Sequence, residues 1–119
     1  MNDYAEIWNT HSNAPALVLL SNGEVVDLSG TTRVTVNFGG SPVVIVDSST
    51  SPTAFDWATT VEYPAGSGTN VNALHLKFGA EGLDVGQYPD CELAIYDAAH
   101  PNGLVFTSEL KLKVREQHA

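Results

Sequence analysis

The sequence predicts an all-β fold, because the spacing of apolar residues and the placement of turn residues both point to strands. Apolar residues recur at every second position in several segments, most clearly in "TTRVTVNF" at 31–38, and this alternation is typical of strands with one buried face. Glycine, proline and asparagine separate these segments, as in "SNGE" and "AAHPNG". No stretch of helical length repeats apolar residues at intervals of three and four. We therefore expect strands joined by tight turns.

Four segments show the alternation well enough to assign an inner face. Their expected inner residues are Thr32, Val34, Val36 and Phe38, then Leu74, Leu76 and Phe78, then Cys91, Leu93 and Ile95, and finally Leu110, Leu112 and Val114. Further strands are expected at 16–20, 24–28, 42–47 and 59–63, of which the first and third are apolar enough to be buried on both faces. The dipeptide Asn22-Gly23 predicts a two-residue hairpin turn.

The stretch "GLDVGQYPDCELAIYD" at 82–97 predicts how two strands are joined. Leu83 would anchor the core, Gly86 would allow a sharp turn, and Tyr88 would place its ring in the core and its hydroxyl on the upstream backbone, as in the tyrosine corner of immunoglobulin-like sandwiches. Seven or eight strands are enough for such a fold. The prediction is an immunoglobulin-like antiparallel β-sandwich that forms one domain over residues 1–119, a common domain length.

Composition and charge argue against several classes of partner. The formal net charge is -9, with 14 acidic and five basic residues, which disfavours binding to a phosphate backbone. No run approaches the roughly 20 apolar residues of a membrane span, and the first residues resemble no secretion signal. Cys91 is the only cysteine, so no intrachain disulfide is expected and synthesis in a cytosol is the simplest inference. We expect no nucleic acid and no membrane insertion.

The chain offers little that predicts catalysis or a cofactor. Ser67 lies in a glycine-rich run that lacks nucleophile-elbow spacing, and the four histidines are scattered. Aspartates near expected strand ends could in principle gather round calcium, but turn formation is the better interpretation for Asp47, Asp84, Asp90 and Asp97. We expect Cys91 to be a small buried apolar residue. The predictions are no enzyme activity, no cofactor and no metal.

Two aromatic groups are the expected contacts with a partner. Tyr4, Ile7 and Trp8 either form a first strand of the chain's own sheet or dock on a neighbour, which would make residues 1–15 an N-terminal assembly arm. Phe55 and Trp57 lie in the longest irregular stretch and either close one end of the core or form an exposed interaction loop. We take both groups as interface candidates.

Three stretches also resemble a known class of proteins. "NGEVVDLSGTTRVTVNF", "FDWA" and "LHLKFGAEGLDVGQYPDCELAIYDAAHPNGLVFTSELKLKV" are similar to small proteins encoded among the structural genes of tailed bacteriophages and prophages. In layout they resemble the N-terminal immunoglobulin-like domain of phage baseplate upper proteins, although such a protein continues into a further domain. The resemblance covers residues 20–115.

The resemblance implies a non-enzymatic virion protein, made in the bacterial cytoplasm and acting as a structural part or adaptor in the tail, baseplate or fibre-attachment region. Its partners would be other virion proteins and copies of itself. A capsid decoration protein on the head is an alternative within the same class. From another class, a carbohydrate-binding module would stack exposed tryptophan and tyrosine rings on host glycans.

Overall fold

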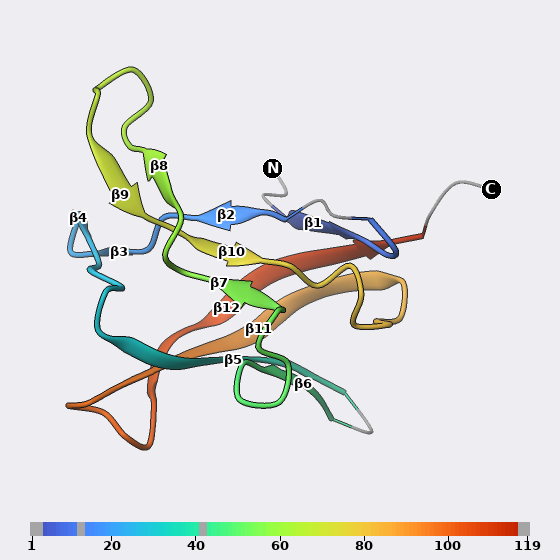
Figure 1. The fold of residues 1–119 in the computed structure, drawn as a ribbon. Coiled ribbons are helices and arrows are strands. Elements are labelled where there is room, and N and C mark those ends of the chain that lie inside the picture. The colour runs from blue at the N-terminus through green and yellow to red at the C-terminus, as the bar shows by residue number, and fades with distance from the viewer. Residues whose placement is uncertain (1–3, 12–13, 41–42, 117–119) are drawn as a thin grey trace.

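The computed structural model describes residues 4–11, 14–40 and 43–116, and over these it contains strands, turns and no helix. The strands form two layers (Figure 1). A five-stranded sheet has the order β1-β12-β11-β5-β6, and a three-stranded sheet has the order β2-β10-β7. The first sheet comprises β1 (Ala5–Trp8), β5 (Thr31–Gly39), β6 (Val44–Asp47), β11 (Gly86–Asp97) and β12 (Leu104–Arg115). The prediction of an all-β chain is confirmed.

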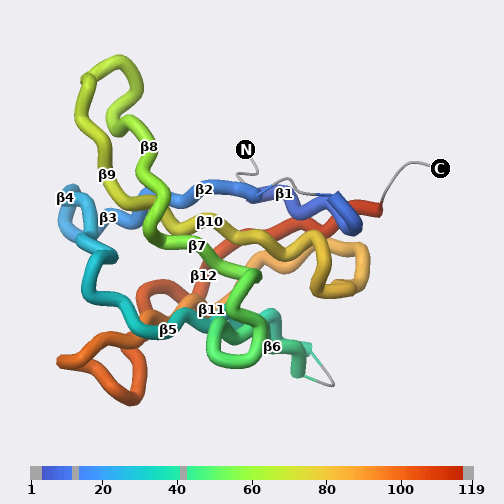
Figure 2. The backbone as a smooth tube through the Cα atoms, viewed as in Figure 1, coloured from blue at the N-terminus to red at the C-terminus, as the bar shows by residue number. Residues whose placement is uncertain are grey.

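The second sheet is built from shorter strands, and two hairpins extend from it (Figure 2). Its members are β2 (Ala16–Leu17), β7 (Phe55–Asp56) and β10 (Leu74–Leu76). The hairpins pair β3 (Leu20–Ser21) with β4 (Glu24–Val25) and β8 (Thr60–Glu62) with β9 (Asn70–Asn72). Asn22 and Gly23 both have positive φ angles, 53° and 81°, which is what a type I′ turn requires. The predicted hairpin is confirmed.

One hydrophobic core lies between the two sheets, and the predicted alternation accounts for most of it. Val34, Val36 and Phe38 of β5 are buried, while Thr32 on the same strand is exposed and its hydroxyl donates to the Tyr96 carbonyl. The other buried core members that alternation predicted are Leu74, Leu76, Phe78, Cys91, Leu93, Leu112 and Val114. Ile95 and Leu110 pack partly buried against this core.

The corner before β11 holds the chain where it passes between the sheets. The Tyr88 hydroxyl donates to the Asp84 carbonyl at 2.6 Å, and its ring meets Phe38 edge-on with 5.1 Å between centroids. Leu83 is buried. Gly86 is not the turn residue: a Cβ there would make only ordinary contact with the Tyr88 ring, and the left-handed position is Gly82, with a φ of 67°. The prediction for Gly86 is corrected accordingly.

Residues 5–11 form part of the fold. β1 runs parallel to β12, with Ile7 opposite Val114, and Ile7 is 0% exposed. Beyond β1, the Asn9 amide donates to the Arg115 carbonyl at 3.0 Å and the Thr10 amide donates to the Gly79 carbonyl at 2.8 Å. A side chain on Gly79 would overlap the His11 carbonyl oxygen. The first of the two alternatives for this segment, a strand of the chain's own sheet, is the one observed.

Several predicted strands are shorter or more exposed than expected. Residues 16–20 contribute only β2 and the first residue of β3, residues 24–28 only β4, and residues 59–63 only β8. The largest difference concerns 42–47, which we expected to be buried on both faces. Within β6 only Val46 is buried, because β6 is the last strand of its sheet and nothing pairs with its outer edge among the described residues.

Removing the Tyr88 hydroxyl should destabilise the corner without disturbing its packing. Tyr88→Phe keeps the ring against Phe38 but leaves the Asp84 carbonyl without this donor. We expect the free energy of unfolding to fall by about 0.5–1.5 kcal/mol, the usual net contribution of one hydrogen bond, in urea denaturation followed by circular dichroism. Tyr63→Phe, at a tyrosine 36% exposed, is the matched control and should change stability little. Equal effects would contradict a special role for Tyr88.

Truncating Ile7 should lower stability as truncation of a core residue does. Ile7→Ala removes apolar volume from a completely buried position, and such changes cost about 2–5 kcal/mol. The measurement is the same denaturation experiment. Val85→Ala, at a valine 55% exposed, should cost little. A stable Ile7→Ala protein would show that β1 is dispensable for folding.

Candidate functional site

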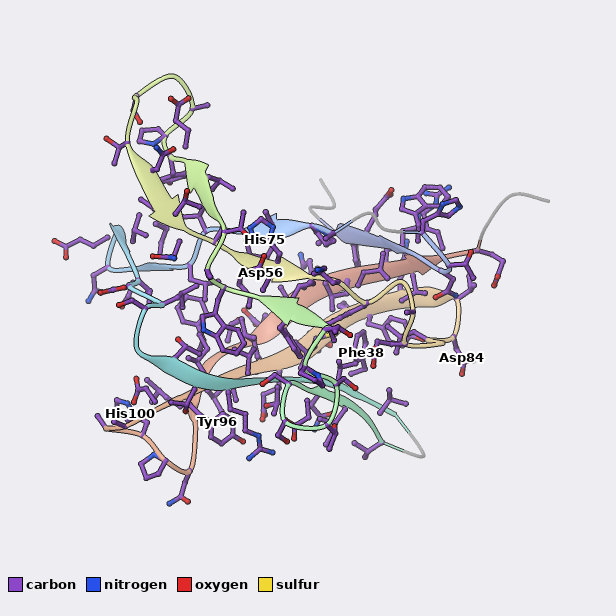
Figure 3. The ribbon with its side chains drawn as sticks, viewed as in Figure 1. Phe38, Asp56, His75, Asp84, Tyr96 and His100 are labelled. Carbon is purple, nitrogen blue, oxygen red and sulfur yellow. The ribbon has the colours of Figure 1, made fainter. Side chains whose placement is uncertain are left out.

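The five-stranded sheet has one face on the core and one face turned away from the second sheet, here called the open face. Figure 3 shows the contrast: Phe38 points between the sheets and Tyr96 points away from the second sheet. Outward residues alternate with core residues along each strand. The open face comprises Glu6, Trp8, Arg33, Thr35, Asn37, Ile45, Asp47, Gln87, Glu92, Ala94, Tyr96, Val105, Lys111, Lys113 and Arg115.

An ion pair orders the centre of the open face. The Arg33 guanidinium donates to both carboxylate oxygens of Asp47, from Nε to Oδ1 at 2.9 Å and from Nη2 to Oδ2, and it lies 4.5 Å from the Tyr96 ring centroid. Together with the Ser49 amide and hydroxyl, which also donate to Asp47, Arg33 holds the Asp47 pKa far below its usual range. The arrangement fixes β6 to β5 at this point.

Apolar residues surround this ion pair. Ile45 and Val105 are 53% and 52% exposed, and they line, with Thr35, Ala94 and others, a shallow depression of about 250 Å³. The same lining contains polar residues, among them Asn37 and Glu92, so this part of the open face is mixed in character and not a continuous apolar patch.

The free edge of β6 is the most exposed apolar segment described. Val43, Val44 and Ile45 are 58%, 40% and 53% exposed, and residues 43–47 contain no lysine. Edge strands are commonly protected by short length, bulges, proline or charge, because unpaired backbone groups otherwise template pairing with another chain. β6 has four residues, its pairing with β5 contains a register shift, and Pro42 precedes Val43 in the sequence. The edge therefore offers a further strand the unpaired backbone and exposed side chains of a short segment.

A second depression adjoins the edge on the core side. Val44 lines it together with Phe38, Tyr88 and Leu83, and Glu81 and Asp84 stand at the same site, which has a volume of about 120 Å³. The depression thus combines an apolar lining with two carboxylates. An incoming strand that places an apolar side chain beside Val44 would bring its neighbouring residues close to these acids.

The opposite edge of the open face holds an aromatic and charged group. Arg115 lies over the Trp8 ring, 4.7 Å from its centroid, and donates to Glu6 Oε2 at 3.3 Å. Lys113 is opposite Glu6 in the parallel pair of β1 and β12. One face of the Trp8 indole is thus already in contact with a guanidinium from the same chain.

The residues predicted to form an interface differ in burial and in location in the structure. Ile7 and Phe55 are core residues, 0% and 6% exposed, so neither offers its side chain to a partner in this conformation. Trp57 is partly buried against the core, Trp8 lies on the open face, and Tyr4 is partly exposed. Phe55 packs edge-on against Phe78 at 5.1 Å between centroids. Of the two interpretations of Phe55 and Trp57, closure of the core describes what is observed.

Sequence reasoning missed the β6 edge. The run "VVIV" has no period of two, and a fully apolar run is normally the mark of a strand buried on both faces. The signal that could have identified it is its position: the run follows β5 through the "FGGSP" turn, and a hairpin partner with no later strand to pair with becomes an edge.

The thiol and carboxylate side chains that could take part in catalysis make local structural contacts instead. Burial raises the pKa of the Cys91 thiol to about 12, which keeps it protonated and a poor nucleophile. Asp56 is opposite His75 in the pair of β7 and β10 (Figure 3), and its pKa is lowered to about 2 chiefly by the Thr59 hydroxyl and the Ala58 amide. Asp97 likewise accepts from the His100 amide and ring. These aspartates close turns.

Two observations concern metals and membranes. Within the described ranges, no three His, Cys, Asp or Glu side chains come together as a metal site would require. In the same part of the chain, no helix has the length and apolar character needed to cross a bilayer.

Comparison of the chain with protein-family models, with curated proteins and with solved structures found no match.

The ion pair on the open face should make stability depend on acid pH. The folded-state pKa of Asp47 lies below the unfolded value of about 3.9, so the stability that this group contributes is present above that value and is lost progressively as the pH falls below it toward the folded-state pKa. Asp47→Asn should therefore lose less stability than the wild type between about pH 5 and pH 2, measured by urea denaturation across that range. Arg33→Gln should flatten the dependence in the same way, since Arg33 is the largest cause of the shift. Unchanged slopes in both variants would contradict the assignment.

Proposed function

We propose that the chain is a non-enzymatic assembly module of a tailed-bacteriophage particle, and that it docks an extended segment of a neighbouring virion protein along the free edge of β6. The observation that carries the proposal is the exposed run Val43, Val44 and Ile45 on an edge to which no further strand pairs among the described residues. The virion context rests on the sequence resemblance alone. Within it the protein would act as a structural part or adaptor, at the tail, baseplate or fibre-attachment region.

The proposed fold is an immunoglobulin-like sandwich, and three features support it. The three-stranded order β2-β10-β7 corresponds to strands B, E and D of that fold, and β12-β11-β5-β6 corresponds to G, F, C and C′. The long strands β11 and β12 are antiparallel. Tyr88, near the start of the strand that would be F, makes the hydrogen bond of a tyrosine corner.

The edge of β6 provides the two contributions that strand addition needs. Its outward backbone groups can hydrogen-bond a new strand, and its exposed side chains can be covered on both faces of the extended sheet, Val44 on the core side and Ile45 on the open face. Covering the exposed half of one such side chain contributes about 1 kcal/mol. Several residues in register would be needed to offset the loss of freedom on association.

Charge indicates the chemistry of the docking segment. Glu81 and Asp84 stand beside Val44, and the chain carries a net charge of -9. A segment with alternating apolar side chains and a neighbouring lysine or arginine would pair with the edge of β6 and neutralise the two carboxylates. Another copy of this chain brings the same negative charge, so a different virion protein is the better fit at this edge.

The carbohydrate-binding alternative has less support. A sugar would stack on an open aromatic ring face, and in Trp8 and Tyr96 one of the two ring faces is already covered by a guanidinium, at 4.7 Å and 4.5 Å from the ring centroid. Trp57 packs partly buried against the core. A decoration role on the capsid head uses the same protein contacts and differs only in location, so fractionated heads and tails would distinguish it.

Placing lysines on β6 should strongly reduce the incorporation of the protein into phage particles. The double change Val44→Lys and Ile45→Lys adds the charged residues that normally protect an edge and also places cations where the proposed segment would carry them. We expect a folded protein that is reduced at least about tenfold in purified virions, a loss of roughly 1.4 kcal/mol or more, measured by quantitative mass spectrometry.

The control is Val85→Lys, a change at another exposed valine that lies outside β6. It should leave incorporation unchanged. Equal incorporation of the β6 variant and the wild type would contradict docking at this edge. If the wild type and all variants bind glycans and none of them is found in virions, the virion role itself is contradicted.

A further inference from the structure

We propose a second binding site, separate from β6, in a groove between the segment 26–31, which joins β4 to β5, and the neighbouring ends of β11 and β12. The occupant we infer is a lysine side chain of a partner protein. The groove has a volume of about 310 Å³, and its lining comes from Ser21 of β3, the segment 26–31, β11 and β12. Its size lies at the lower end of the range for ligand pockets.

The floor of the groove is apolar and already part of the core. Leu28 is 1% exposed, and Val26, Ile95 and Phe106 pack partly buried against the core cluster. Leu104 adds a wall that is 54% exposed. Such a surface accepts a flexible hydrocarbon stem, and lysine carries four methylene groups that commonly lie along apolar surface with the ammonium outside.

The rim of the groove is acidic. Asp27 and Asp97 belong to the lining, and no lysine or arginine does. The Ser29 amide donates to Asp27 at 2.9 Å. The His100 ring Nδ1 and the His100 amide donate to Asp97 at 2.9 Å and 2.8 Å. These donors hold the pKa of both carboxyl groups below the usual value, so both carry negative charge at neutral pH.

An apolar stem with a terminal cation is the chemistry that fits both features together. A purely apolar ligand would gain nothing from the two carboxylates, and an anionic one would be repelled by them. A guanidinium has a planar, wider head that favours bidentate contact with a single carboxylate. The compact ammonium of lysine needs no such fixed geometry and can pair with either Asp27 or Asp97 of the lining.

The test uses two small probes of equal stem length with the folded wild-type protein. Nα-acetyl-lysine methylamide and Nα-acetyl-norleucine methylamide are titrated separately while backbone amide shifts are followed by NMR. We expect saturable shifts that centre on Thr31, Ile95 and Leu104, with the lysine probe binding about three- to fivefold more tightly, as expected for an exposed ion pair.

Variants assign the effect to the groove. Asp97→Asn should remove most of the preference for lysine over norleucine, whereas His100→Asn, which keeps the Asp97 carboxylate, should preserve it. Leu104→Ser should weaken both probes. Equal affinity for the two probes, or no saturable shift with either, overturns the proposal. Failure here leaves docking at β6 unaffected, because the β6 variants change no residue of this groove.

Discussion

The fold depends on a chain of aromatic contacts that joins the two sheets. Phe78, which follows β10, is completely buried, and it meets Phe55 of β7 at 5.1 Å and Phe38 of β5 at 6.1 Å between ring centroids. Phe38 in turn meets Tyr88 of the corner. The rings therefore connect both sheets with the turn between them, and edge-on packing of this kind adds about 0.5–1.5 kcal/mol per pair beyond burial.

The packing of Phe38 in this aromatic cluster determines which face of each strand is left for function. Once Phe38 points into the core, alternation along β5 turns Arg33, Thr35 and Asn37 outward. The same alternation on β12 turns Lys111, Lys113 and Arg115 outward. Four of the five basic residues of the chain consequently lie on the open face, and the acidic excess is left to the rest of the molecule.

Much of this arrangement could be predicted from the sequence, and the reason is periodicity. A period of two assigns residues to faces without knowledge of strand order, which is why the inner residues of β5, β10 and β12 were identified. Periodicity carries no information on which strand lies at the edge of a sheet. The sequence therefore predicts a strand buried on both faces at 42–47, whereas β6, which lies within it, has a neighbour on only one side.

The N-terminal segment shows a second limit. Tyr4, Ile7 and Trp8 are apolar and have no hairpin partner nearby in sequence, so sequence alone left open whether they serve the core or a neighbour. Parallel pairing with β12 links residues more than a hundred positions apart. Such pairing has no local turn signal. Only the complete sheet shows that β12 needs a neighbour on its outer side and that Ile7 fills the space against Val114.

The negative charge of the chain and the exposed edge of β6 have opposite effects on pairing between identical copies. An apolar edge strand on a neutral protein would invite pairing between identical chains. Here every copy carries a charge of -9, which opposes close approach of two copies over distances of about 10 Å at moderate salt. If β6 docks a segment as we propose, this repulsion would keep the edge free until a segment of suitable charge reaches it, where short-range strand pairing and apolar contact would outweigh the remaining repulsion. Raised salt would weaken that protection first, because screening acts on the charges and leaves the apolar edge unchanged.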